Sequence, residues 1–120
     1  MAPPTRDLAE RSLRFSKELA RFVEREQRRR VLSARVLDQL LRAGTAIGAH
    51  NAEADAAITR RHLLALRAGA LKEALETEYW LDIVASAGHS QSGSDVAALR
   101  LQASQLTAIL TTCVKKLRGQ

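Results

Sequence analysis

The stretch Gln39–Ala54 reads QLLRAGTAIGAHNAEA and combines an apolar helical stripe with a run of very small side chains. Leu40 and Ile47 belong to the stripe. In an exposed helix Gly44 and Gly48 would each cost about 1 kcal/mol relative to alanine, so close contact between two backbones is the better explanation for them. The stretch therefore predicts a helix that packs tightly against a neighbour.

Apolar residues at helical spacing continue on both sides of this stretch and predict four helices. We expect them to span about residues 6–27, 34–55, 60–87 and 95–117. Thr5, Ser33, Thr59 and Ser94 stand at the expected starts, where a hydroxyl can accept hydrogen bonds from free backbone N–H groups. The third helix is expected to stop near Gly88. Four helices with short links in 120 residues predict one all-α domain over residues 1–120, an antiparallel up-down-up-down four-helix bundle.

The last expected helix carries a coiled-coil-like apolar seam. Its members are Val96, Leu99, Ala103, Leu106, Leu110, Cys113 and Leu117. Cys113, the only cysteine, is expected to be a small core residue, and it excludes an intrachain disulfide and any multi-cysteine zinc module.

The chain is basic, with a formal net charge of +6, and the charge is unevenly distributed. Residues 1–35 carry +5, residues 36–92 carry −2 and residues 93–120 carry +3. Such a chain can attract a polyanion, or the basic ends of one subunit can pair with the acidic helix of another. No apolar run approaches the roughly 20 residues of a membrane span, and the N-terminus has no signal-like stretch. We therefore expect a cytoplasmic protein without a membrane partner.

Three basic segments are candidates for binding nucleic acid, RNA or DNA. They contain Arg25, Arg28, Arg29, Arg30 and Arg35 between the first two helices, then Arg60 and Arg61, and finally Lys115, Lys116 and Arg118. The alternative is that they are solvated helix ends, where arginine suits the negative end of the helix dipole. Aromatic residues make up only 3% of the chain and none lies in a basic segment, so we expect salt-sensitive contacts to the backbone rather than base stacking.

The third expected helix carries a cluster of two acids and two aromatic residues, Glu73, Glu76, Tyr79 and Trp80. We expect the aromatic residues to join helices or subunits, and the acids to face arginines such as Arg42 or those of a neighbouring subunit. A carboxylate pair for acid–base chemistry would need a cleft, which the sequence does not indicate.

Two residues of the second expected helix are candidates for a metal site. His50 and Glu53 have the spacing of half a di-iron ligand set, but His62 and His89 do not provide the other half. No phosphate loop, dinucleotide fingerprint or nucleophile elbow occurs. We expect neither a metal nor a cofactor, and no enzymatic activity.

Two blocks carry a resemblance to a known family. The stretch Gln39–Ala54 and the stretch Leu71–Leu81, LKEALETEYWL, resemble the four-helix-bundle proteins related to those encoded in ribosomal-RNA intervening sequences. That family includes the accessory variability determinant of diversity-generating retroelements. The chain departs from the family pattern at Ala46, where the family has serine, and at His50, where it has asparagine.

The resemblance implies a four-helix protomer and a ring-shaped homopentamer. For the retroelement branch it also implies nucleic-acid binding and association with a reverse transcriptase. A chain of the intervening-sequence type would instead be a structural or protein-interaction oligomer without a nucleic-acid role.

Overall fold

The computed structural model describes residues 7–87 and 93–119, and helices make up nearly all of this part of the chain. The helices are α1 (Leu8–Arg29), α2 (Ala34–Ala54), α3 (Arg60–Ser86) and α4 (Gly93–Leu117). Their bounds lie within two residues of those expected from periodicity. The described residues contain no strand, so the chain is all-α as expected.

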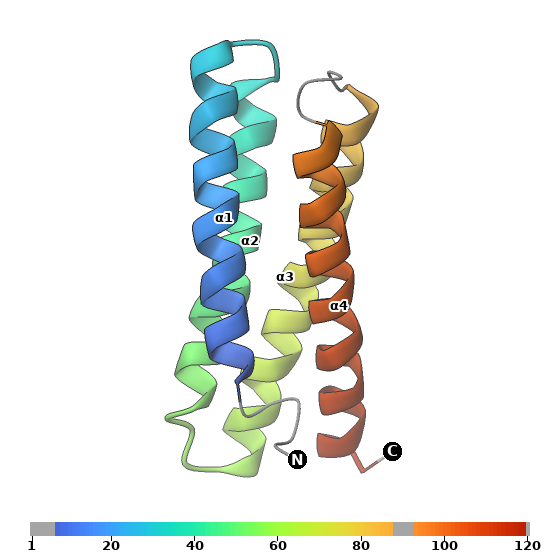
Figure 1. Ribbon diagram of the computed structural model, residues 1–120. Helices are drawn as coiled ribbons and strands as arrows, with labels where there is room; N and C mark the ends of the chain where they lie inside the picture. Colours follow the sequence, from blue (N-terminus) through green and yellow to red (C-terminus); the bar gives the residue numbers. More distant parts are fainter. Residues whose placement is uncertain (1–6, 88–92, 120) are drawn as a thin grey trace.

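Successive helices run in opposite directions and pack side by side into a four-helix bundle (Figure 1). The bundle measures 45 × 22 × 21 Å along its principal axes. One end holds the link between α1 and α2 together with the start of α4, and we call it the α1–α2 end. The opposite end holds the link between α2 and α3, the start of α1 and the end of α4, and we call it the α2–α3 end. Of the four contacts between neighbouring helices, that between α1 and α4 is the smallest.

Two of the expected helix starts are confirmed by their capping hydrogen bonds. Ser33 Oγ accepts from the backbone N–H of Val36 at 3.3 Å, and Thr59 Oγ1 accepts from that of His62 at 3.0 Å. α1 begins after Asp7, whose side chain makes no capping hydrogen bond. α4 begins at Gly93, so the expected cap Ser94 lies inside its first turn. Thr5 and Gly88 lie outside the described residues.

The small residues of α2 bring its backbone close to α1. A Cβ atom at Gly44 would overlap Cδ2 of the buried Leu19, and one at Gly48 would lie 3.3 Å from Ser16 Oγ. The predicted close packing is therefore confirmed, and α1 is the neighbour.

The apolar seam of α4 differs from expectation near its end. Val114 is 2% exposed and occupies the core, whereas Cys113 and Leu117 are only half-buried. The seam continues from Leu110 by a step of four residues instead of three, and this rotates Cys113 to the edge of the core. The prediction that Cys113 is a core residue is wrong. No helix among the described ranges combines the length and apolarity that crossing a membrane requires.

Candidate nucleic-acid interface

The arginine run Arg25–Arg35 wraps around the link between α1 and α2. Arg30 follows the last residue of α1 and has a left-handed backbone conformation, with φ 56° and ψ 33°. Its N–H donates to the carbonyl of Glu26 at 3.2 Å, which closes the helix end. Arg28 precedes this turn and Arg35 lies in the first turn of α2. The fold therefore gathers the run at one end of the bundle, which we call the arginine cluster, comprising Arg25, Arg28, Arg30 and Arg35.

Two members of the arginine cluster pair with exposed carboxylates. Arg28 contacts Glu24, four residues earlier on α1, and Arg25 contacts Asp95 of α4. All four side chains are more than half exposed. Exposed pairs of this kind contribute about 0–1 kcal/mol, so a phosphate can replace either carboxylate at little cost. The part of the chain that the structure describes contains no ion pair of Arg30 or Arg35.

Arg29 differs from its neighbours because its partner is buried. Its Nη1 lies 3.0 Å from Glu26 Oε2, and the Glu26 side chain is only 4% exposed. Loss of the arginine would deprive a buried carboxylate of this charge partner, which is strongly unfavourable. Arg29 therefore stabilises the end of α1 through this pair, and its contact with nucleic acid stays a prediction.

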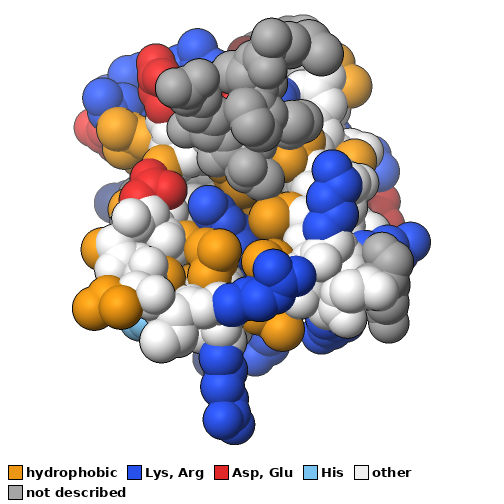
Figure 2. Space-filling model, turned by 90° about the horizontal axis from the view of Figure 1, so that it is seen from below, with side chains coloured by type: hydrophobic (Ala, Val, Ile, Leu, Met, Phe, Trp, Pro, Cys, Tyr) orange, Lys and Arg blue, Asp and Glu red, His pale blue; other side chains and the backbone are white. Residues whose placement is uncertain are grey.

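The remaining basic candidates lie at the opposite end of the bundle. Figure 2 shows lysine and arginine side chains around the α2–α3 end. Arg60 donates hydrogen bonds there to the carbonyls of Lys116 at 3.1 Å and Leu117 at 3.2 Å, so it caps the last turn of α4. The other candidates, Arg61, Lys115, Lys116 and Arg118, are exposed. These residues lie at the other end of a bundle that is 45 Å long, so in a single chain they are separate from the arginine cluster, and their contact with nucleic acid stays a prediction.

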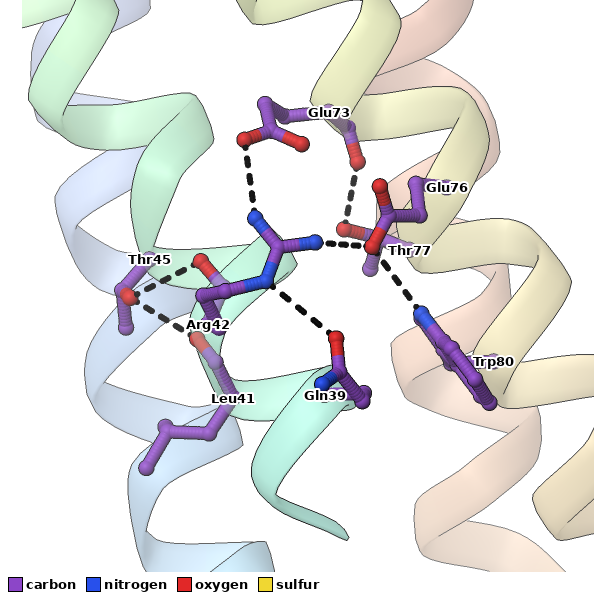
Figure 3. A network of polar contacts seen from close by, with 8 residues as sticks. All are labelled: Gln39, Leu41, Arg42, Thr45, Glu73, Glu76, Thr77 and Trp80. Atoms are coloured by element: carbon purple, nitrogen blue, oxygen red, sulfur yellow. Dashed lines mark hydrogen bonds and ion pairs between the residues drawn. The ribbon is translucent and has the colours of Figure 1, made fainter. Parts of the chain in front are cut away.

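The acidic residues of α3 meet Arg42 of α2, as the sequence suggested (Figure 3). Arg42 Nη1 lies 3.3 Å from Glu73 Oε2, and its Nη2 contacts Glu76 Oε2. Trp80 Nε1 donates to the same Glu76 oxygen at 3.1 Å. Hydrogen bonds from Trp80 and Arg42 hold the pKa of Glu76 below its ordinary value, although burial opposes this. These carboxylates therefore serve to join α2 to α3.

The two aromatic residues of this cluster have different surroundings. Their rings make an edge-to-face contact with centroids 5.2 Å apart. Trp80 packs against the apolar core, whereas Tyr79 is 60% exposed. Trp80 is thus an interhelix contact, and a role for Tyr79 between subunits stays a prediction.

A buried polar group that the sequence analysis missed ties three helices together. Asn51 of α2 is fully buried, and its Nδ2 donates to Ser12 Oγ of α1 at 2.9 Å. Its Oδ1 accepts from Nη1 of Arg67 of α3 at 3.0 Å. Arg67 is itself 5% exposed, and its Nη2 lies 3.7 Å from Asp55. The sequence does contain one indication of this group, because Arg67 is the only charged residue in the apolar stretch LLALRAGAL.

His50 lies beside this group and faces α3. Its ring atoms are 3.2–3.3 Å from the position that a Cβ at Gly69 would occupy, so the glycine makes room for the imidazole. Its Nδ1 is buried and has no hydrogen-bond partner among the residues that the structure describes, and Glu53 is exposed. Within residues 7–87 and 93–119, no group of three or more histidine, cysteine or acidic residues could hold a metal ion.

These features define a basic four-helix protein with a cluster of basic side chains at each end of the bundle. A solved structure with a similar fold is a protein of unknown function from the S23 ribosomal protein family of Bacteroides thetaiotaomicron. It superposes with a TM-score of 0.77 and 27% sequence identity, covering 92% of this chain and 97% of the other. No protein-family model and no curated protein matches the sequence. The similarity supports a relation to that helical family.

Proposed function

We propose that this protein is a non-enzymatic scaffold that binds nucleic acid through the arginine cluster. The observation that carries the proposal is the gathering of four exposed arginines around the link between α1 and α2. Among residues 7–87 and 93–119, two of them have no ion pair and two pair only with exposed carboxylates. A guanidinium binds phosphate through two parallel hydrogen bonds, and it keeps its charge at any physiological pH. No aromatic residue lies in the run, so the contacts do not include base stacking, and we expect them to be made to the phosphate backbone.

The family resemblance extends the proposal to assembly and partner. We infer a ring-shaped homopentamer that serves as an accessory protein of a diversity-generating retroelement and associates with its reverse transcriptase. Five copies would bring the total charge to roughly +30 and repeat the arginine cluster around the ring.

A second candidate is a structural or protein-interaction oligomer without a nucleic-acid role. It is favoured by an apolar groove of about 520 Å³ between α1 and α2, lined by small residues and by Leu13, which is 51% exposed. Burial of such a groove against another copy would stabilise an oligomer. Light scattering with and without RNA and DNA separates the candidates. A pentamer that gains no nucleic-acid mass favours the second candidate.

The site assignment is tested with two charge-matched double variants. Arg30→Glu/Arg35→Glu reverses the two cluster arginines that have no ion pair among the described residues, and Lys72→Glu/Arg100→Glu reverses two exposed basic residues outside the arginine cluster. Fluorescence anisotropy with labelled RNA and DNA measures the affinity. We expect the first variant to bind at least about tenfold more weakly and the second to change by about twofold, since only the first removes phosphate contacts. Equal affinities would contradict the site assignment.

A further inference from the structure

A polar groove runs between α1 and α4, the neighbouring helices with the smallest contact. It consists of two hollows that share Glu18 in their lining, one of about 320 Å³ and one of about 220 Å³. The larger hollow is bordered by Arg11 and Arg14, and the smaller one by Arg21 and Arg25. Because Arg25 belongs to the arginine cluster, the groove begins where that cluster ends. We call the two hollows together the α1–α4 groove.

The arginines of the α1–α4 groove come from one face of α1. Positions 11, 14, 18, 21 and 25 follow one another by steps of three and four residues, which places them on one side of a helix. Arginine occupies four of these positions, and Glu18 occupies the middle one. At 1.5 Å per residue, the row from Arg11 to Arg25 extends over about 21 Å.

Positive charge in the α1–α4 groove exceeds negative charge. Its lining contains four arginines and two carboxylates, those of Glu18 and Asp95. Glu18 accepts a hydrogen bond from the neutral amide of Gln102 on α4 at 2.6 Å, and Asp95 pairs with Arg25. Arg14 and Arg21 are exposed and take part in no ion pair among the described residues. Two full positive charges therefore remain available to a ligand.

The floor of the α1–α4 groove does not suit nucleobases. Phe15 and Phe22 lie beneath it, and each is only 1% exposed, so neither ring presents a face on which a base could stack. Arginine side chains above an apolar floor favour a sugar–phosphate backbone that lies along the groove while its bases point to solvent.

We propose that the α1–α4 groove holds the sugar–phosphate backbone of one nucleic-acid strand as that strand leaves the arginine cluster. This inference rests on the proposed function and names the path that the ligand takes. A row of about 21 Å is long enough to contact several successive phosphates of one strand. Only the phosphates are recognised, so RNA and DNA strands of equal length bind with similar affinity.

The test compares three double variants that change the net charge equally. They are Arg14→Glu/Arg21→Glu in the α1–α4 groove, Arg30→Glu/Arg35→Glu in the arginine cluster, and Lys72→Glu/Arg100→Glu as the control outside both. Each is titrated with labelled single-stranded RNA and DNA of about 20 nucleotides, and circular dichroism and light scattering check helicity and mass. We expect the groove variant to bind both strands at least about tenfold more weakly than the control. Arg14→Lys/Arg21→Lys should restore most of the affinity, since a lysine also contacts phosphate.

The outcomes separate this inference from the proposed function. If the cluster variant loses binding while the groove variant equals the control, the inference is overturned and the proposed function stands. If the wild-type protein binds neither strand, the proposed function fails. If the groove variant changes the mass of the free protein, the groove is a contact between subunits and the inference is overturned. Should the groove variant lose helicity, Arg14→Gln/Arg21→Gln makes the same comparison with a milder change.

Discussion

The guanidinium of Arg25 on α1 lies 3.2 Å from the carboxylate of Asp95 on α4. This pair bridges the α1–α4 groove at the point where the groove meets the arginine cluster. Both side chains are about half exposed, so the pair is weak, and the proposed function requires a phosphate to compete with Asp95 for the same arginine.

Removal of the Asp95 charge should strengthen nucleic-acid binding. In Asp95→Asn the guanidinium of Arg25 is available to phosphate, and we expect binding to single-stranded RNA about threefold tighter, measured by anisotropy. Asp82→Asn is the matched control, because Asp82 also pairs with an arginine, Arg100 at 3.4 Å, but between α3 and α4. Unchanged or weaker binding by Asp95→Asn would contradict the proposal that nucleic acid binds in the α1–α4 groove.

Trp80→Phe should reduce the acid sensitivity of the protein. The lowered pKa of Glu76 means that its contribution to stability is present above the ordinary glutamate pKa and is lost as the pH falls through the lower, folded-state value. Without the indole N–H that pKa rises toward its ordinary value, so less stability is lost on acidification. Urea unfolding at about pH 7 and about pH 3 gives the difference for each protein. Tyr79→Phe, a change to the exposed neighbour, should behave as the wild type, and an equal pH dependence in all three would contradict the prediction.

Asn51 and Arg67 should be energetically coupled. Asn51→Leu removes the hydrogen-bond acceptor of a buried guanidinium, and Arg67→Met leaves the amide oxygen of Asn51 without its donor. We expect each single variant to lose about 2–4 kcal/mol of unfolding free energy. The double variant should lose at least about 1 kcal/mol less than the sum, because neither group is then left unpaired. Urea unfolding of the wild type, the two single variants and the double variant measures these losses. If the losses are additive, Asn51 and Arg67 are not energetically coupled.

The two glycines of α2 should respond differently to alanine. Gly44→Ala forces Cδ2 of the buried Leu19 to move, which should cost about 1–3 kcal/mol despite the better helix propensity of alanine. In Gly48→Ala the new Cβ would lie 3.3 Å from Ser16 Oγ, so we expect the free energy of unfolding to remain nearly unchanged. Thermal or urea unfolding measures both. A larger loss for Gly48→Ala would be inconsistent with the packing of α2 on α1.

Local patterns were sufficient to predict much of this fold. The helices follow from the 3.6-residue period, and Ser33 and Thr59 mark the starts of α2 and α3 because capping needs only nearby residues. The contact of Arg42 with Glu73 and Glu76 could be expected because helices joined by a short link become neighbours.

Features that depend on distant parts of the chain could not be predicted. Steps of three and four residues allow either Cys113 or Val114 in the core, and only the packing of the neighbouring helices selects Val114. The row of arginines from Arg11 to Arg25 is visible in the sequence, but its importance depends on α4, which lies about 80 residues later. The capping of α4 by Arg60 depends on the same long-range packing.

The salt dependence of binding tests the central claim most directly. Wild-type protein would be titrated with a labelled RNA strand of about 20 nucleotides at salt concentrations from about 50 to 200 mM. Binding through the arginine cluster and the α1–α4 groove predicts a straight line of log affinity against log salt with a slope of about −3 or steeper, because each phosphate contact on a single strand contributes about −0.7. The Arg30→Glu/Arg35→Glu variant should give a slope smaller in magnitude by more than about 1. No binding, or an affinity independent of salt, would contradict a nucleic-acid function.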